Sequence, residues 1–325
     1  MLRAYGPGCD GSLIEAPTDK IPDGATWVDL EEPTAEEEAL VERCIHMDVP
    51  TESEMAEIEP SSRLYEHDGA LYMTVSVLYG VEDGQPTTTP ISFVLTDNRL
   101  VTVRYATPKP VRSFSEHARR DPDLVKDAPT ALVRMLDALI DRLADELENV
   151  SRDIEQISVH IFHKDVDDRR IPAKRLTALL TRIGRTQTLL TRTRLSAVST
   201  LRLLSFLSGA NRFHEEGSSD MRHHIASMTT DATSLSDHAT YLSDNVTFLL
   251  DASLGLISIE QNAAMKLFSW AALVFLPPTL IAVIYGLNFH RMPELSWAYG
   301  FPFALTLIAI SAIVPVLYLK RRGWI

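Results

Sequence analysis

The stretch Asp251–Phe289, DASLGLISIEQNAAMKLFSWAALVFLPPTLIAVIYGLNF, decides how this chain is built. From Leu267–Phe289 it contains no Asp, Glu, Lys or Arg, and Leu295–Leu319 is a second run without charge. A helix needs about 20 residues to cross a hydrocarbon core of about 30 Å, and each run is long enough. The sequence therefore predicts two transmembrane helices, over about 267–287 and 300–319, in preference to two buried core helices.

Basic residues at the ends of these spans predict how the chain is oriented. Lys266 precedes the first span, and Lys320, Arg321 and Arg322 follow the second. By the positive-inside rule both termini are cytoplasmic and residues 287–300 face outward. The first twenty residues have no signal-peptide pattern. We expect a multi-pass protein of the cell (inner) membrane with about 265 residues on its cytoplasmic side.

Composition narrows the functional classes of the cytoplasmic part. The net charge of −13 argues against a nucleic-acid partner. The two cysteines, Cys9 and Cys44, provide neither a disulfide framework nor a metal-ligand spacing. No glycine-rich phosphate loop, nucleophile elbow or His/Cys cluster occurs, and His67 with Asp68 is interpreted as a solvated turn. We expect no enzymatic activity.

Residues 1–125 combine helix and strand signals. Thr34 and Glu37 form a capping-box pattern at the start of a helix. Asp68-Gly69 and Asp97-Asn98 each separate two apolar segments, as hairpin turns do. The pattern predicts a small cytoplasmic α/β domain over 1–125.

Residues 126–265 are predicted to be almost wholly helical. The first helix has an apolar face, made by Leu132, Leu136, Leu139, Leu143, Leu147, Val150, Ile154 and Ile157, and an acidic face. The second, around Ala173–Leu207, is basic, and residues 169–213 include no acid. We interpret the two as an antiparallel hairpin with complementary charges. Alternatively, the acidic helix gathers cations or the basic helix contacts anionic lipid.

A third helix starts near Ser218 and continues as a stalk into the first span, so that residues 266–325 form the transmembrane domain. Steps of 3.6 residues from Asp251 select a mostly small or polar stripe: Gly255, Ser258, Asn262, Met265, Ser269, Ala272, Leu276, Thr279 and Val283. Tight helix packing is one explanation of small residues, but Asp251 and Asn262 on the same line favour a pore-lining face with a carboxylate ring at its inner mouth. Pro277-Pro278 predicts a kink that neighbouring helices or water must satisfy. Two spans cannot enclose a water-filled path alone, so we expect a homo-oligomer with this helix at its centre.

Five segments resemble a known family, the CorA-type divalent cation channels (magnesium/cobalt transporters). They are Ile259–Lys266 (IEQNAAMK), Phe275–Thr279 (FLPPT), Tyr285–Phe289 (YGLNF), Met292–Leu295 (MPEL) and Tyr318–Trp324 (YLKRRGW). The likeness is dense over 245–325 and looser but collinear before it. It implies an α+β membrane protein assembled as a funnel-shaped homopentamer in the lipid bilayer, whose cytoplasmic domain senses intracellular Mg²⁺.

The resemblance also assigns residues by matched position. Gly286-Leu287-Asn288 stands where the family has Gly-Met-Asn, and Asn288 matches the asparagine whose amide oxygens receive hydrated Mg²⁺. Glu294 is the acid of the outer loop. The other matches are polar pore positions (Thr279, Asn262, Asp251), hydrophobic constrictions (Leu276, Phe268, Met265) and a basic collar (Lys266, Lys320, Arg321, Arg322).

Two departures from the family pattern leave the ion open. Leu287 replaces the signature methionine, as an aliphatic residue does in the ZntB-like zinc branch, whereas the Met-Pro-Glu-Leu loop favours the magnesium branch. His290-Arg291 stands where many relatives have an acid, and a histidine also suits Zn²⁺ or Co²⁺. We therefore expect gated passive influx of Mg²⁺, with Co²⁺ and Ni²⁺. The alternatives are a Zn²⁺ transporter, proton-coupled or not, and a membrane-anchored sensor.

The regulatory metal ligands are not transferable from the resemblance. By their location on the third helix alone, the candidates are Asp220, Asp231, Asp237 and Asp244, together with His223, His224 and His238.

Overall fold

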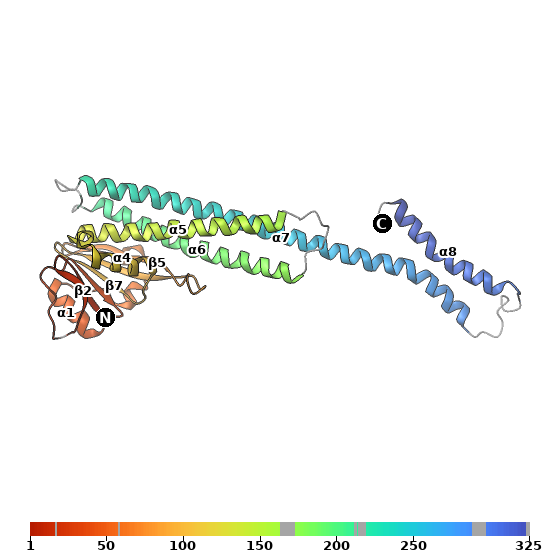
Figure 1. The fold of residues 1–325 in the computed structure, drawn as a ribbon, viewed down its shortest axis with the longest axis horizontal. Helices are drawn as coiled ribbons and strands as arrows, with labels where there is room; N and C mark the ends of the chain where they lie inside the picture. The colour runs from red at the N-terminus through yellow and green to blue at the C-terminus, as the bar shows by residue number, and fades with distance from the viewer. Residues whose placement is uncertain are drawn as a thin grey trace. The chain divides into compact units, whose positions relative to one another are not determined.

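The computed structural model describes residues 1–16, 18–57, 59–162, 173–210, 213, 219–287 and 297–322 (Figure 1). The chain forms two compact units. The first ends at Leu250 and contains a sheet with its covering helices. The second begins at Asp251 and contains two apolar helices.

A seven-stranded sheet in the order β2-β1-β3-β7-β6-β5-β4 organises the first unit. Neighbouring strands are antiparallel except β3 and β7, which are parallel. The strands are β1 (Leu2–Gly6), β2 (Cys9–Ile14), β3 (Trp27–Glu31), β4 (Leu64–His67), β5 (Ala70–Tyr79), β6 (Thr87–Leu95) and β7 (Leu100–Arg104). The β3–β7 pair brings the start of the chain beside residues about 70 positions later.

The predicted turns and caps are confirmed. Thr34 caps α1 (Ala35–Ile45) in a complete capping box with Glu37. Asp68 and Gly69, both at positive φ, join β4 to β5, where His67 pairs with Ala70. The His67 and Asp68 side chains lie 3.4 Å apart and are more than two-thirds exposed, so this pair is solvated as expected.

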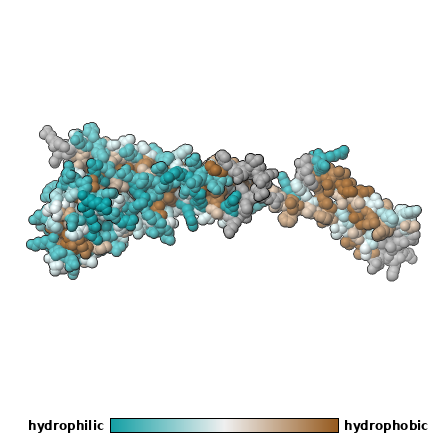
Figure 2. Space-filling model, in the orientation of Figure 1, coloured by the Kyte–Doolittle hydropathy of each residue, from teal (hydrophilic) through white to brown (hydrophobic). Residues whose placement is uncertain are grey.

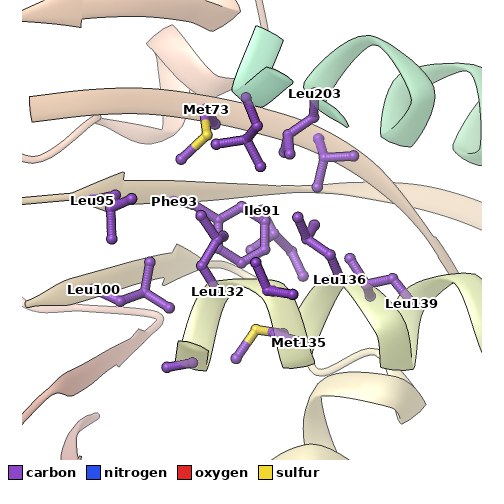
Figure 3. Close-up of a cluster of buried hydrophobic side chains, with 14 of the residues drawn as sticks. Met73, Ile91, Phe93, Leu95, Leu100, Leu132, Met135, Leu136, Leu139 and Leu203 are labelled. Atoms are coloured by element: carbon purple, nitrogen blue, oxygen red, sulfur yellow. The ribbon is translucent and has the colours of Figure 1, made fainter. Parts of the chain in front are cut away.

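Helices cover both faces of the sheet and give it two cores. One face packs against α1, with Val28, Leu30 and Val41 fully buried. The other face packs against α4 (Lys109–Arg120), α5 (Ala128–Phe162) and α6 (Ala173–Gly209). Figure 3 shows this second core, where Ile91 and Phe93 of β6 meet Leu132 and Leu136 of α5. Two short helices, α2 (Glu52–Met55) and α3 (Pro60–Arg63), and the 3-10 turn η1 (Pro122–Val125) complete the unit.

A buried ion pair ties the two parallel strands together. Arg104 Nη2 lies 2.8 Å from Asp29 Oδ2, and both residues are at most 4% exposed. The same guanidinium donates to Glu31 at 2.9 Å, and Thr102 donates to Asp29 at 2.6 Å. Hydrogen bonds to Arg104 and Thr107 lower the pKa of Glu31 although burial alone would raise it. Each charge is therefore paired, as a buried charge must be.

The α5–α6 hairpin is present, but its helices are joined mainly by apolar contacts. Leu143 of α5 packs with Ala197 of α6, and every apolar position predicted for α5 is buried. Among the described residues, one ion pair joins the two helices, Arg182 to Asp153 at 2.7 Å. The two helices therefore form the predicted hairpin, and among the described residues their complementary charges meet directly in this one pair.

One helix, α7 (Ser219–Gly286), runs for 68 residues, confirming that the third helix continues into the first apolar run. Pro277 and Pro278 lie inside it. The last helix, α8 (Gly300–Arg321), has 22 residues. Both are long and apolar enough to span a membrane. Hydrophobic surface is concentrated over this second unit, whereas the first unit is mainly hydrophilic (Figure 2).

Candidate functional site

The stripe predicted on the second part of α7 is open to its surroundings. Asp251, Asn262 and Thr279 are exposed, as are all the small residues between them on the stripe. Met265 and Leu276, on the same line, are each 68% exposed, and Phe268 beside them is 72% exposed. A helical stripe that carries a carboxylate, an amide and hydroxyls thus runs along a helix that is otherwise apolar.

The less exposed positions of this segment lie on another face. Ala263, Trp270, Val274, Ile281 and Tyr285 are half-buried and recur at helical spacing. At 100° per residue they fall about 120–180° round the helix from Leu276. The stripe thus lies away from the half-buried face, and apolar positions off the stripe, such as Ile259 and Phe275, are exposed as well.

Thr279 shows how the helix presents polar atoms on this face. Its hydroxyl donates to the carbonyl oxygen of Phe275 at 2.6 Å, four residues earlier. Because the proton is used within the helix, the lone pairs of the hydroxyl oxygen remain for an outside donor. The water molecules of a hydrated cation are donors of this kind.

The predicted basic residues lie at one end of each apolar segment. Lys320 and Arg321 occupy the last turn of α8, and the Arg322 guanidinium lies 5.7 Å from the centre of the Tyr318 ring. Lys266 is exposed on α7. Within the described ranges, none of these four cations has an ion-pair partner in the chain, so all four remain available to phosphate or carboxylate groups.

Several predicted site residues lie outside the described residues. These are Asn288 and Glu294, together with His290 and Arg291. The helix α7 ends at Gly286, and Leu287, which is 45% exposed, is the last described residue before them. The roles of Asn288, Glu294, His290 and Arg291 stay predictions.

The candidate regulatory residues on α7 are dispersed over the first unit. Asp220, Asp231, Asp237 and Asp244 are all exposed. In the part of the chain that the structure describes, no three His, Cys, Asp or Glu side chains lie close enough together to hold a metal ion. The described residues of one chain therefore form no group of three such ligands.

Sequence reasoning missed a histidine–carboxylate contact and an arginine with two carboxylate partners. All of these pairs except Arg142–Glu146 join residues far apart in the chain. His224 Nε2 lies 2.7 Å from Asp137 Oδ2, which links α7 to α5. Arg142 contacts Glu146 at 2.5 Å and Glu82 at 2.7 Å, which fixes the β5–β6 loop to α5. Burial raises the pKa of Glu146 despite the neighbouring Arg142. The i,i+4 spacing of Arg142 and Glu146 on α5 could have indicated that pair, whereas no local pattern indicates the contact with Glu82.

The fold and the open stripe define a class of membrane protein. A sheet-containing unit precedes one very long helix, whose second part and a following helix are apolar enough to span a bilayer. Comparison with known proteins identifies the class: residues 22–321 match the family described as CorA-like Mg²⁺ transporter protein. The chain belongs to this family, whose members are transporters or channels and not enzymes.

Individual relatives agree with this assignment. The magnesium transport protein CorA of Haemophilus ducreyi is 33% identical over 329 residues, covering all of both chains. The solved CorA magnesium transporter of Methanocaldococcus jannaschii aligns with a TM-score of 0.76 at 19% identity, covering 100% of this chain and 99% of the other. The ZntB cytoplasmic domain of Vibrio parahaemolyticus aligns with a TM-score of 0.51 at 12% identity, over 74% of this chain and 88% of that domain. The two structural matches bear on the fold alone.

Proposed function

We propose that this protein mediates gated, passive influx of Mg²⁺, with Co²⁺ and Ni²⁺ as further substrates, through a homopentameric pore lined by α7. The observation that carries the proposal is the exposed stripe from Asp251 to Val283, which is mostly polar or small along a helix that carries no Asp, Glu, Lys or Arg from Leu267 onward. Two spans cannot surround a water-filled path, so the stripes of several copies must face one another. The relatives at 33% identity are named as magnesium transport proteins.

The orientation follows from charge. Lys266 and the cluster Lys320, Arg321 and Arg322 place the amino-terminal unit and both termini in the cytoplasm, on the inner side of the cell membrane. The membrane potential, negative inside, then drives cations inward without chemical coupling. The driving force is about 2.3 kcal/mol per charge for each 100 mV.

The chemistry of the stripe suits a hydrated Mg²⁺ ion. This ion dehydrates reluctantly, so neutral oxygens that accept hydrogen bonds from its water shell bind it without trapping it. Asn288 at the outer end, then Thr279 and Asn262, supply such oxygens. Leu276, Phe268 and Met265 form apolar constrictions that close by losing water.

Gating is assigned to Mg²⁺ in the cytoplasm. Because one chain gathers no three metal-binding side chains in its described part, closure requires carboxylates from more than one copy. Asp251, at the inner end of the stripe, gives a ring of carboxylates. Asp251→Ala is expected to shift the internal Mg²⁺ concentration that halves the flux, and to change the maximal flux less.

A Zn²⁺ transporter is the second candidate, and Leu287 in place of the family's methionine is the observation that favours it. Proton coupling would need an acid or a histidine inside the membrane. Residues 267–287 and 300–319 contain neither.

Ion uptake by the purified protein in liposomes tests the proposal. A Mg²⁺-sensitive dye inside reports flux, Zn²⁺ and Co²⁺ are tested in parallel, and voltage and pH gradients are imposed separately. Mg²⁺ entry that follows voltage and ignores the pH gradient is expected. Zn²⁺ entry that depends on the pH gradient, with little Mg²⁺ flux, would replace this proposal with the zinc alternative.

A further inference from the structure

Exposed arginines without partners mark one side of the first unit. Arg192 and Arg202 of α6 are exposed, and neither forms an ion pair within the described residues. Arg63 of α3 is half-buried and donates to Ser76 Oγ at 3.1 Å and to the carbonyl oxygen of Glu57. Burial, and then the nearby charge of Arg202, lower the pKa of Arg63. Arg63 and Arg202 therefore bring two cations close together, and Arg192 lies ten residues, about 15 Å, before Arg202 on the same helix. These three arginines, none of which has an ion-pair partner among the described residues, are here called the basic flank.

Exposed carboxylates without partners mark another side. Asp141 and Asp145 of α5 and Asp231 of α7 are exposed, and in the described parts of the chain none has a cation within ion-pair distance. Burial, and then the charges of Asp137, Asp145 and Asp231, raise the pKa of Asp141. Asp141, Asp145 and Asp231 are here called the acidic flank.

Cations near the acidic flank are already engaged elsewhere. Arg134 lies 3.7 Å from Asp137, and Arg142 contacts Glu146 and Glu82. Both arginines line a cavity of about 670 Å³ together with Asp141 and Asp145. The free carboxylates thus border a hollow that an incoming side chain can enter.

The two flanks lie on opposite sides of the helical layer. Across the sheet order β7-β6-β5-β4, α6 packs on β5 and β6, while α5 packs on β6 and β7 and meets α4. Arg63, just before β4, donates to Ser76 of β5. The backbone N–H of Ser76 donates to Ser199 Oγ of α6 at 2.9 Å, so Arg202, one turn further along α6, lies towards that edge of the sheet. The cavity that Asp141 and Asp145 share with Lys109 and His117 of α4 places the acidic flank on the other side.

We propose that the basic flank of one copy docks on the acidic flank of the next copy in the assembled protein. Opposite charges on opposite sides of one chain make a head-to-tail contact, and such a contact repeats until a ring closes. Complementary charge of this kind fixes the register of the contact and disfavours other pairings. The inference rests on the proposed function in one respect, that the protein works as a homo-oligomer, and it assigns the surfaces that join the copies.

Charge reversal in the full-length protein tests the docking. Arg192→Glu with Arg202→Glu reverses the basic flank, Asp141→Arg with Asp145→Arg reverses the acidic flank, and a third protein combines all four changes. Light scattering and native mass spectrometry in detergent measure the protein concentration at which half of the assembly has dissociated. Each reversal is expected to raise this concentration about tenfold or more, and the combination to restore most of the loss.

A matched control has the same change of charge away from the flank. Arg43 lies on α1, which covers the other face of the sheet, and Arg194 lies two residues from Arg192, about 200° round the helix. Arg43→Glu with Arg194→Glu is expected to leave assembly near the wild-type level. Circular dichroism checks that each variant is folded.

Cross-linking gives a second measurement that does not depend on destabilised variants. Arg192→Lys with Arg202→Lys keeps the charge and adds amines, which a carbodiimide joins to carboxylates in direct contact. Mass spectrometry is expected to find links from residue 192 or 202 to Asp141, Asp145 or Asp231, and only in bands heavier than one chain.

Two outcomes would overturn the inference while leaving the proposed function intact. In one, the wild type is assembled, but reversing the basic flank does not weaken assembly and cross-linking finds no link between the flanks. In the other, only the acidic-flank reversal weakens assembly and a chelator has the same effect, so that the acidic flank holds divalent cations instead of arginines. A wild-type protein that runs as a single chain would overturn both this inference and the proposed pore.

Discussion

Leu136 of α5 is fully buried beneath the sheet, whereas Leu276 of α7 is 68% exposed. A leucine in the first unit is therefore surrounded by apolar residues of its own chain. A leucine on the exposed part of the second unit needs apolar surroundings from outside the chain. Polar groups differ in the same way: Asp29 is paired in the core with Arg104, whereas Asp251 and Asn262 are open. The first unit has its own core, whereas the second exposes apolar surface that lipid and, in the proposed pore, further copies would cover.

The helix α7 contains both situations. In the first unit its apolar residues Ile225, Met228, Ala232 and Leu242 are buried. Beyond Asp251 the same helix exposes many large apolar side chains, among them Phe268, Phe275 and Leu276. We therefore expect substitutions in the first unit to change the stability of that unit. Substitutions on the stripe or at its outer end are expected to change ion flux.

The largest effect on flux is expected at Asn288, which provides the outer oxygen ring of the proposed pore. Asn288→Ala removes the acceptors for the water shell of the ion, so Mg²⁺ uptake into liposomes should fall to the leak of empty liposomes. The assembled size in detergent is the control and should not change. Asn288→Asp serves as the matched variant: a carboxylate should bind Mg²⁺ more tightly and conduct more slowly. Wild-type flux through Asn288→Ala would refute this assignment.

The largest effect on stability is expected at Arg104. Arg104→Ala leaves Asp29 buried without its charge partner, which costs about 3–5 kcal/mol. For a unit of this size the unfolding midpoint should fall by about 10 °C. Thermal unfolding in detergent, followed by circular dichroism, measures the shift. Arg112→Ala, at an exposed arginine of α4, is the control and should change the midpoint little.

Sequence reasoning predicted those features that depend on neighbours along the chain. The capping box of Thr34, the turn at Asp68-Gly69 and the apolar spacing of α5 follow from local residue types, and the structure contains all three. The continuity of α7 followed from the absence of proline and the scarcity of glycine before Pro277.

Contacts between distant residues were not predictable in the same way. Nothing local indicates that Arg104 pairs with Asp29 or His224 with Asp137, since sheet order and helix rotation determine both contacts. For the same reason, the complementary charges of α5 and α6 did not indicate which side chains pair, namely Arg182 with Asp153. The residue pattern predicted the sign of the charge on each helix face, but not the direction in which that face points.

A smaller effect on flux is expected at Thr279. Thr279→Val keeps the shape of the side chain and removes the outward-facing oxygen. One lost hydrogen bond is worth about 1 kcal/mol, so Mg²⁺ flux should fall about fivefold. Thr306→Val on α8 is a matched control, because the Thr306 hydroxyl donates to the carbonyl oxygen of Pro302 at 2.8 Å in the same i to i−4 geometry. An equal loss of flux in both variants would show that the loss comes from altered helix geometry and not from the missing pore oxygen.

The smallest effect is expected at the N-cap of α1. This substitution should change the stability of the first unit without changing flux, so it tests the difference between the two units most directly. Thr34 Oγ1 accepts from the Glu37 backbone N–H at 3.3 Å, and the Glu37 carboxylate accepts from the Thr34 backbone N–H at 2.9 Å. Thr34→Ala should therefore cost about 1 kcal/mol of stability, while Thr34→Ser, which keeps the hydroxyl, should recover most of it. Thermal unfolding measures this loss, and liposome flux well below the unfolding temperature should not change. A drop in flux while the protein is fully folded would contradict this difference between the units. It would show that a local change beside the sheet alters the pore without unfolding the first unit.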